Sequence, residues 1–547
     1  MFGLKVAYFY FVAIQITLIK FFKTIYFSTN AYNKSLISKI PTQVYFNPNP
    51  FLLSIISPYK KKLFKINDIN PNNFWLENKD KNTLDQHNFL WLNLIDRKID
   101  GKNIQKIIYL WMLKYSNFKR KIWETSTLSS RVISWMLNID IIINNGTFDF
   151  KKTLFQNIIC QCNHLKKNIK FEKDPIKRIE VLSALTLSGI IFKEYEENYK
   201  IGVKELEKFV KNYFDKDGFP LTRSPNDHIC FTKYLILCHE SIKDAQHYMP
   251  EFLDDIIRKN LRCIKFLKAP NNQFPLFNGG SENKLDNFDK YLEDFKLSKK
   301  DAKDVIGGIF HAKTKNQNLY FDVGPPPEKA FSKNYQSGPL SFEYFIDGIK
   351  IVTNCGFGDK ISGKAELLSR LTASQSTLTI NDTTITKFER NKLINRTFGN
   401  SIKNTFKTTE LKIKNDKDVI GSSISHNGYE KDFNCIHKRE VYLDVGKNKL
   451  QGIDHILKKS DGTPIRYVFR FHLNPKLSVV KTMSGNSALI QLSKNKSLIF
   501  TVKDENIELE KSVYLGGKKM LDNTCITISG NLVNKNKSFN WEIKKKI

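Results

Sequence analysis

Leu340-Ser-Phe-Glu-Tyr-Phe-Ile-Asp-Gly-Ile-Lys-Ile-Val-Thr-Asn-Cys-Gly356 lies near the point where the chain changes from a helical to a strand-like pattern. Between residues 340 and 346, large apolar side chains recur at every second position, which is the period of a β-strand. Asp347-Gly348 is a two-residue turn sequence, and residues 349–354 then return as a second strand. The segment therefore predicts a β-hairpin, in which Glu343 is expected to pair with Arg370.

Before this point the pattern is helical. From about residue 85 to 295, apolar residues recur every three or four positions, as they do on one face of a helix. Short polar connections separate the predicted helices, and successive antiparallel pairs predict a toroid or a helical array. The longest predicted helices span residues 179–195, 203–214, 229–239 and 252–267.

After about residue 303 the apolar period is two, and Gly, Asn and Asp turns recur between the apolar runs. Helices first and strands second predict two segregated regions rather than an α/β sheet. An all-β sandwich fits the second region. Besides the hairpin, its predicted strands span residues 319–323, 376–380, 440–445, 466–473, 489–492, 498–502 and 524–529.

The 547 residues carry a formal net charge of +32. Such a charge attracts polyanions, which include acidic polysaccharides, nucleic acids and membrane surfaces. The lysines are scattered rather than clustered, so we favour a compositional bias toward Lys, Asn, Ile and Phe as its origin. No helix-turn-helix, zinc-finger or RNP signature accompanies the charge, so a nucleic-acid partner rests on charge alone.

The N-terminus leaves two interpretations open. Lys5 precedes a mostly apolar stretch at residues 6–19, and Lys20 and Lys23 follow it. This stretch is short for a membrane span. It has the length of a signal-peptide core, yet no A-x-A-like cleavage site follows. An export signal and an amphipathic or buried first helix both remain, so a membrane partner is undecided.

Three motifs near the hairpin indicate a family. Val323-Gly-Pro-Pro-Pro327 precedes the hairpin, and Arg370-Leu-Thr-Ala-Ser-Gln-Ser-Thr-Leu378 follows it. In this order they resemble the C-terminal region of the heparinase II/III-like family of polysaccharide lyases. Members of that family carry a histidine just before Leu-Ser-Phe-Glu and another in the Arg-x-Thr-Ala-x-His segment. Here glutamines, Gln336 and Gln375, occupy both positions.

The resemblance extends over most of the chain. Its further matches are Trp123 with Arg131 and Trp135, Asp217-Gly218 through Ser224-Pro-Asn-Asp-His228, Phe277-Asn-Gly-Gly280, and Ser425-His-Asn-Gly-Tyr429 with His437-Lys-Arg439. It implies an α+β multidomain protein, an N-terminal α-helical (α/α) incomplete toroid followed by a C-terminal antiparallel β-sandwich. The domains implied are an N-terminal segment at 1–84, the toroid at 85–300 and the sandwich at 301–547.

The resemblance also implies a reaction, the β-elimination of a uronate-containing acidic polysaccharide. A base removes the proton next to the carboxylate, an acid protonates the leaving oxygen, and a cation or amide stabilises the developing charge. The alternative is a carbohydrate-binding or envelope-polysaccharide assembly protein of the same fold that has lost the chemistry. The implied location is the cell envelope or periplasm if the chain is exported, and the cytoplasm otherwise.

The family site implies which residues take part. Glutamine cannot titrate, so proton transfer is expected from His228, Tyr234 or Tyr335. The implied catalytic set is His228, Tyr234, Tyr335 and Gln336. The implied substrate-binding set is Arg131, Trp135, Arg223, Asn226, Gln375 and His437.

Each of these assignments has a structural alternative. Asp227, at the family's tyrosine position, is then a helix cap, and His228 a surface residue. Arg131 and Trp135, four residues apart on one predicted helix face, are then core residues of the toroid. A lone strand histidine such as His437 is more often structural.

No metal or other cofactor is expected. The eight cysteines include no CxxC pair. His228 and His239 are eleven residues apart on one predicted helix, too far to share a ligand. Some lyases of this family bind zinc in the sandwich, but the loss of both motif histidines argues against it here. The sequence sets no oligomeric state.

Overall fold

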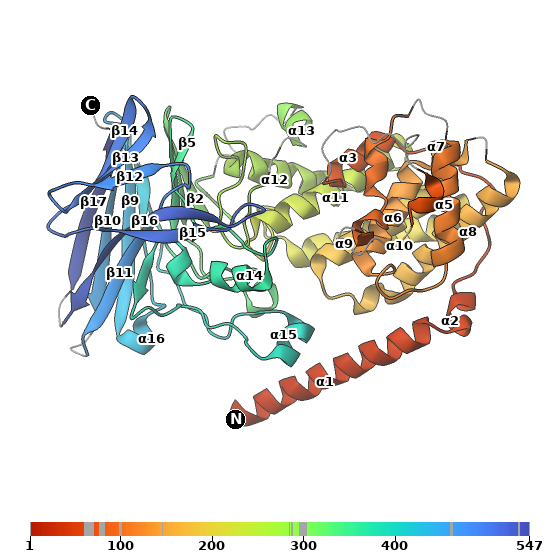
Figure 1. The fold of residues 1–547 in the computed structure, drawn as a ribbon, viewed down its shortest axis with the longest axis horizontal. Helices are drawn as coiled ribbons and strands as arrows, with labels where there is room; N and C mark the ends of the chain where they lie inside the picture. The colour runs from red at the N-terminus through yellow and green to blue at the C-terminus, as the bar shows by residue number, and fades with distance from the viewer. Residues whose placement is uncertain are drawn as a thin grey trace. The chain divides into compact units, whose positions relative to one another are not determined.

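The computed structural model describes residues 2–58, 70–75, 83–97, 101–144, 146–283, 285, 288–294, 303–459, 463–533 and 536–545. These divide into two compact units. The N-terminal unit comprises Met1–Tyr213 and Ile229–Arg258, and the C-terminal unit comprises Phe214–His228 and Lys259–Ile547. Helices come first in the chain and antiparallel sheets follow, which confirms the predicted fold class (Figure 1). The predicted boundary at residues 300 and 301 lies outside the described residues.

Within the described residues, thirteen α-helices precede the first strand. The four longest predicted helices are confirmed as α9 to α12, with shifted ends. Pro175 begins α9, and the Asp174 side chain caps this helix by accepting hydrogen bonds from two backbone amides. In the N-terminal unit, α9 packs against α6, α8 and α10. The helices are α1 (Phe2–Phe27), α2 (Asn30–Ser35), α3 (Leu53–Ile56), α4 (Thr83–Gln86), α5 (Lys102–Tyr115), α6 (Thr125–Leu137), α7 (Ile139–Ile143), α8 (Phe148–Asn168), α9 (Pro175–Ile191), α10 (Glu196–Tyr213), α11 (Pro225–Asp244), α12 (Glu251–Leu267) and α13 (Asp289–Asp294).

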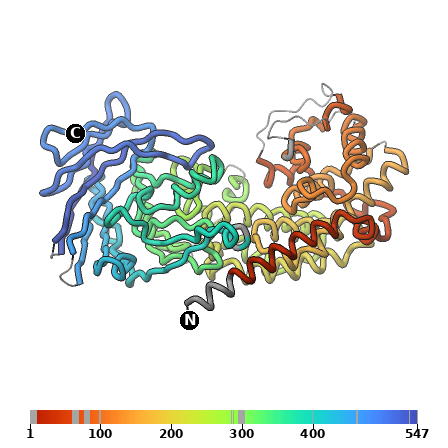
Figure 2. The backbone as a smooth tube through the Cα atoms, turned by 60° about the horizontal axis from the view of Figure 1, so that its bottom comes forward, coloured from red at the N-terminus to blue at the C-terminus, as the bar shows by residue number. Residues whose placement is uncertain are grey.

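Helix α1 differs most from its sequence-based expectation. It continues as one helix through Lys20 and Lys23 to Phe27, well past the apolar stretch recognised in the sequence. Only 6% of the window Tyr10–Phe27 is buried, so the structure does not show a buried first helix. Figure 2 shows α1 as one continuous helix near the start of the chain.

The C-terminal unit contains three antiparallel sheets. Their strand orders are β1-β2-β3-β4-β5, β12-β13-β14-β17-β10-β9-β8-β7 and β15-β16-β11-β6, and every described pair is antiparallel. Three short helices interrupt the strands: α14 (Gly363–Ser369), α15 (Lys392–Phe398) and α16 (Glu430–Phe433). The strands are β1 (Val305–Ile306), β2 (Ile309–Lys313), β3 (Gln317–Asp322), β4 (Phe342–Ile346), β5 (Ile349–Val352), β6 (Leu378–Ile380), β7 (Lys412–Asn415), β8 (Val419–His426), β9 (Cys435–Asp444), β10 (Lys449–Lys458), β11 (Ile465–His472), β12 (Ser478–Lys481), β13 (Ser487–Ser493), β14 (Lys496–Val502), β15 (Glu508–Tyr514), β16 (Leu521–Leu532) and β17 (Lys537–Lys545).

The predicted hairpin is confirmed as β4 and β5. Asp347 and Gly348 both have positive φ angles, 49° and 78°, as a tight hairpin turn requires. Every residue of β4 is buried, because the second face of its sheet is covered as well. There the ring of Phe266 from α12 packs against His311 of β2.

The predicted partner of Glu343 is wrong. Its carboxylate accepts hydrogen bonds from Lys350 Nζ at 2.8 Å and Thr353 Oγ1 at 2.9 Å, both supplied by the returning strand and the residue after it. Arg370 instead donates to the backbone carbonyls of Tyr335 and Ser332, at 2.9 and 3.0 Å. Proximity in the hairpin decided the pairing, because the neighbouring strand brings a lysine directly beside the buried carboxylate.

The three sheets share one core around Trp541 of β17. Its ring stacks on Phe342 of β4, with centroids 5.4 Å apart, and packs edge-on against Phe471 of β11 at 5.0 Å. Its indole nitrogen donates to the buried carboxylate of Asp454 at 2.8 Å. Arg439 lies opposite Asp454 in the β9–β10 ladder and donates to both carboxylate oxygens, at 2.7 and 3.1 Å.

This ion pair is completely enclosed. Burial alone would raise the pKa of Asp454, but Arg439 and His437 hold that pKa well below its usual range. The remaining guanidinium nitrogen of Arg439, Nη1, donates to the carbonyls of Leu340 and Ser376, at 2.7 and 2.8 Å. A buried pair contributes little net stability by itself, but removing one partner leaves an uncompensated charge.

We therefore expect Arg439→Met to lower the free energy of unfolding by about 3–5 kcal/mol, because Asp454 would stay buried without its counter-ion. Urea denaturation followed by circular dichroism measures this loss. Arg466→Met is the matched control, since Arg466 pairs with Asp382 at the surface, where the side chains are 59% and 55% exposed. The control should change stability by about 1 kcal/mol or less. Equal losses in the two variants would contradict a central role for Arg439.

Candidate functional site

Arg223 is held by backbone rather than presented to solvent. Its guanidinium donates to the carbonyls of Gly307, Pro325 and Gly308, at 3.0, 2.6 and 3.1 Å, and to the carboxylate of Asp322. A Cβ at Gly308 or at Gly324 would lie within 2.6 Å of the guanidinium, so both glycines are needed for this close approach. Arg223 is thus a buried clamp that joins the 217–228 segment to the strands of its own unit.

Gly279 connects two of the predicted site residues. Its carbonyl accepts a hydrogen bond from the Asn226 amide. Its backbone N–H donates to Gln336 Oε1 at 3.0 Å. The Phe277-Asn-Gly-Gly280 turn therefore links Asn226, in the first turn of α11, to Gln336, which precedes β4.

Gln336 and Gln375, which occupy the family's histidine positions, come together. Both amide nitrogens donate to the carbonyl of Ser369, at 2.7 and 2.8 Å. Both also lie within 4 Å of the Cys355 sulfur. Each glutamine is only 2% exposed, so the structure places them as internal supports of the 369–375 turn.

A group of polar side chains lies around Lys360, and we call Asn226, Ser281, Asn283 and Lys360 the amide–lysine cluster. Lys360 is exposed, Asn226 and Asn283 are half-buried, and Ser281 is buried. Asn226 Nδ2 donates to Ser281 Oγ at 3.0 Å, and Asn283 Nδ2 donates to Asn226 Oδ1 at 2.5 Å. Lys360 Nζ donates to Ser281 Oγ at 3.0 Å and to Asn283 Oδ1 at 3.3 Å. Hydrogen bonds thus hold one ammonium group among amides and a hydroxyl.

Further polar groups border the amide–lysine cluster. Tyr514 Oη donates to Glu282 Oε1 at 2.7 Å, and the Glu282 backbone N–H donates to Gly516 O at 2.7 Å. Burial lowers the pKa of Lys360; Asp359 opposes this shift, and the nearby charge of Lys518 adds to it. The cluster therefore combines a cation and hydrogen-bond donors, which suit a carboxylate ligand. The exposed carboxylates of Glu282 and Asp359 would repel such a ligand.

The predicted proton carriers of the C-terminal unit are completely buried. Burial lowers the pKa of His228 to about 3, and its ring packs against Phe219 with centroids 5.1 Å apart. Burial also raises the pKa of Tyr335 well above its ordinary value, with the charge of Asp322 adding to the shift. Both side chains are therefore neutral near pH 7, and neither is a surface residue.

His437 belongs to the core network described above. Its Nε2 lies 2.7 Å from Asp454 Oδ1, and its side chain is completely buried. Burial lowers the pKa of His437, although Asp454 opposes that shift. This geometry favours the structural interpretation of His437 over contact with a substrate. Among the described residues, no group of three His, Cys, Asp or Glu side chains could hold a metal ion.

Arg131 and Trp135 also lie in a core, that of the N-terminal unit. Arg131 donates to Gln161 Oε1 at 2.7 Å and to two backbone carbonyls, and its guanidinium lies 4.4 Å from the Trp111 ring centroid. Arg131 and Trp135 are both 0% exposed. A side chain without exposed surface does not reach a polymer, so the packing alternative fits their positions.

Tyr234 has a carboxyl partner that the sequence did not reveal. In the N-terminal unit, Tyr234 Oη donates to Glu180 Oε1 at 3.3 Å. Burial raises the pKa of Glu180 to about 7, and the neighbouring Glu124 adds to that shift. The pKa of Tyr234 is raised well above its ordinary value by burial and by Glu180. Glu180 thus titrates near neutral pH from inside the helical core.

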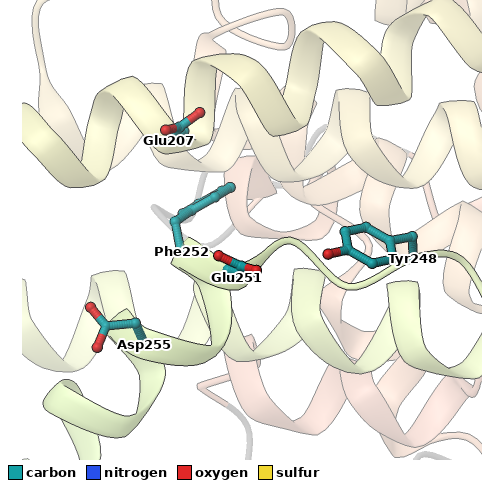
Figure 3. A pocket seen from close by; sticks show the side chains of 5 residues that line it. All are labelled: Glu207, Tyr248, Glu251, Phe252 and Asp255. Carbon is teal, nitrogen blue, oxygen red and sulfur yellow. The ribbon is translucent and has the colours of Figure 1, made fainter.

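A surface hollow in the N-terminal unit has the wrong charge for a polyanion. Its volume is about 530 Å³, and it is lined by Glu207, Tyr248, Glu251, Phe252 and Asp255 (Figure 3). Three carboxylates would repel a uronate polymer. We therefore place the candidate site at the amide–lysine cluster.

The sequence indicated Asn226, and it indicated Ser281 because this residue directly follows the Phe277-Asn-Gly-Gly280 motif. It did not indicate Asn283 or Lys360. Lys360 carried no signal, because it is one of 87 basic residues and lies in no recognised motif. Only the fold brings residues 226, 283 and 360 together.

Comparison with known proteins agrees with the fold. Residues 301–542 match the family model described as "Heparinase II/III-like, C-terminal". This region is a heparinase II/III-like domain. The resemblance seen in the sequence is thereby confirmed, and the matched region contains Gln336, Lys360 and Gln375. A search of curated protein sequences found no match.

Solved structures similar to this chain include two lyases. Heparan sulfate lyase HepC from Pedobacter heparinus is 16% identical, with a TM-score of 0.63 over 91% of this chain and 82% of that one. A crystal structure of heparinase III is 14% identical, with a TM-score of 0.67 over 90% and 84% of the two chains. At these identities the similarity establishes the fold alone.

The Glu180 carboxyl should make stability depend on pH. Its pKa is about 7 in the folded protein against an ordinary value of 4.5, so the unfolded chain loses this proton first. The stabilisation is complete below pH 4.5 and is lost as pH rises through 7, a loss of roughly 3 kcal/mol. Glu180→Gln should therefore unfold at a higher temperature than wild type at pH 8, with a smaller difference at pH 5.

Calorimetry at the two pH values provides this test. Glu197→Gln is the control, because the Glu197 side chain is 76% exposed and forms an ion pair with Lys166 at the surface. Its midpoint should shift equally at both pH values. A Glu180→Gln difference that is no larger at pH 8 than at pH 5 would contradict the raised pKa.

Proposed function

We propose that this protein binds an acidic, uronate-containing polysaccharide at the amide–lysine cluster. The observation that carries the proposal is Lys360, an exposed ammonium held among the side chains of Asn226, Ser281 and Asn283. A cation beside amide donors suits a uronate carboxylate, because charge-assisted hydrogen bonds are stronger than neutral ones. Lys518 and the net charge of +32 add long-range attraction for a polyanion.

Cleavage by β-elimination is the second candidate function. The similarity to heparan sulfate lyase HepC and heparinase III supports it. A tyrosine hydroxyl can donate a proton to a leaving oxygen, but Tyr514 beside the cluster is only 2% exposed, and burial raises its pKa. Against it, His228 and Tyr335 are buried and neutral, and glutamines replace both motif histidines. Binding without rapid cleavage is therefore the function that the geometry supports best.

Replacement of Lys360 tests the binding site. We expect Lys360→Gln to weaken binding to uronate polymers by roughly tenfold or more, because a charge-assisted hydrogen bond is lost. Isothermal titration with polygalacturonate, alginate and heparan sulfate measures the change. The control is Lys387→Gln, since Lys387 is 67% exposed and pairs with Asp432. Equal weakening by both variants would indicate non-specific attraction to the overall charge and would contradict this site.

Product formation separates binding from cleavage. Incubation with the same polymers, read by the absorbance of the unsaturated product, should give no rapid rise for wild type. Gln336→His should not restore elimination, because residue 336 is only 2% exposed and is held by backbone groups. A bacterial heparinase serves as the positive control. Rapid product formation by wild type, or a rate raised by Gln336→His, would replace the binding proposal with the lyase.

A further inference from the structure

Helix α1 carries an apolar stripe that its own unit leaves uncovered. Eight large hydrophobic side chains between residues 11 and 26 are 48–62% exposed, and most are separated by three or four positions. At 100° per residue they occupy one broad side of the helix. We call them the α1 stripe: Phe11, Ile14, Leu18, Ile19, Phe21, Phe22, Ile25 and Tyr26.

The end of α1 belongs to the folded N-terminal unit. The ring of Phe27 packs against Tyr32, Phe118 and His164, with centroids 4.5, 5.2 and 5.2 Å apart. The Tyr32 hydroxyl lies 2.7 Å from His164 Nδ1, which ties the segment after α1 to α8. Phe27 thus anchors the end of α1 to this unit, whereas the α1 stripe, which includes Ile25 and Tyr26, is exposed.

Positive charges border the α1 stripe. At 100° per residue, Lys23 lies beside the stripe and Lys20 on the opposite side of the helix. The Lys23 ammonium is 2.9 Å from the ring centroid of Phe171. Phe171 is itself 59% exposed, and exposed lysines 170 and 173 flank it in the sequence. Exposed aliphatic and aromatic side chains bordered by lysines are the composition of helices that lie in a membrane interface.

We propose that the α1 stripe inserts into the surface of a lipid bilayer with anionic headgroups and so holds the protein at a membrane. The Tyr10–Phe27 window has a mean hydropathy of 1.3, and the whole helix of 26 residues is about 39 Å long. Burying the α1 stripe in acyl chains removes its apolar surface from water. The lysines then reach the phosphate groups, each attracted by the negative surface potential. This proposal is independent of the glycan-binding site.

Vesicle flotation with the full chain tests this inference. The protein should float with vesicles of phosphatidylcholine mixed with phosphatidylglycerol, and much less with phosphatidylcholine alone. Leu18→Gln together with Phe22→Gln should reduce the bound fraction at least about tenfold, since two inserted side chains are lost. Val480→Gln with Met483→Gln is the matched control, because these apolar side chains are also exposed, Val480 in β12 and Met483 in the turn after it. The control pair should bind as wild type does.

The charge contribution is tested separately. Lys20→Gln with Lys23→Gln should lower binding to the anionic vesicles by about fivefold per lysine, with little change for neutral vesicles. Circular dichroism of each variant must match wild type, which shows that the fold is retained.

Three results would overturn the proposal. One is the absence of flotation with either vesicle type, and another is an equal loss in the Val480/Met483 control. The third concerns a different occupant: a dimer in light scattering that Leu18→Gln with Phe22→Gln converts to a monomer, without vesicle binding, would assign the α1 stripe to a second copy. N-terminal sequencing of the protein from cells gives a further test. A mature chain that starts after Phe27 would show that α1 is removed and would overturn the proposal.

Discussion

The carboxylate of Asp454 is the constraint on which the C-terminal unit depends. It lies opposite Arg439 in the β9–β10 ladder and accepts hydrogen bonds from Arg439, Trp541 and His437, all of which are buried. Arg439 in turn binds the carbonyl of Leu340, a residue with a positive φ of 57° next to β4. A slip of one residue in this ladder would turn the charge to the other face of the sheet. The ion pair thus fixes the register and joins the eight-stranded sheet to the hairpin.

The burial that stabilises this fold also prevents several titratable side chains from exchanging protons with a substrate. A completely buried imidazole or phenol stays in its neutral form, because charging it inside the protein costs solvation energy. This applies to His228, Tyr335 and His437. Gln336 and Gln375 donate hydrogen bonds to the carbonyl of Ser369, and an amide side chain does not titrate. They therefore cannot take part in proton transfer either. The amide–lysine cluster remains as the candidate site, and its ammonium and amide groups suit the recognition of a charged ligand better than proton transfer.

Several elements could be predicted from the sequence because their patterns are local. The period of three to four residues predicted α9–α12, and the Asp347-Gly348 turn predicted β4 and β5. Strands β10 and β17 were among those missed. In β10, Gly452 and Asp454 occupy buried positions that an apolar alternation would fill, whereas β17 does alternate through Phe539, Trp541 and Ile543 and could have been recognised. The length of α1 was underestimated, since Lys20 and Lys23 resemble the end of an apolar segment. A helix tolerates such residues when their side chains reach solvent, which a one-dimensional pattern does not show.

The sequence by itself determined the order of helices and strands, the hairpin, the family resemblance and the replacement of both motif histidines by glutamine. These depend on neighbouring residues, whose periodicity and turn chemistry act over a few positions. The tertiary structure alone decided which side chains are buried and which meet. Arg223, Arg131 and His437 had the residue types of a binding site, yet backbone carbonyls and buried partners hold them in the interior. Asn226, Asn283 and Lys360 lie far apart in the sequence, and their contact arises because the chain folds segment 214–228 onto the strands of the C-terminal unit.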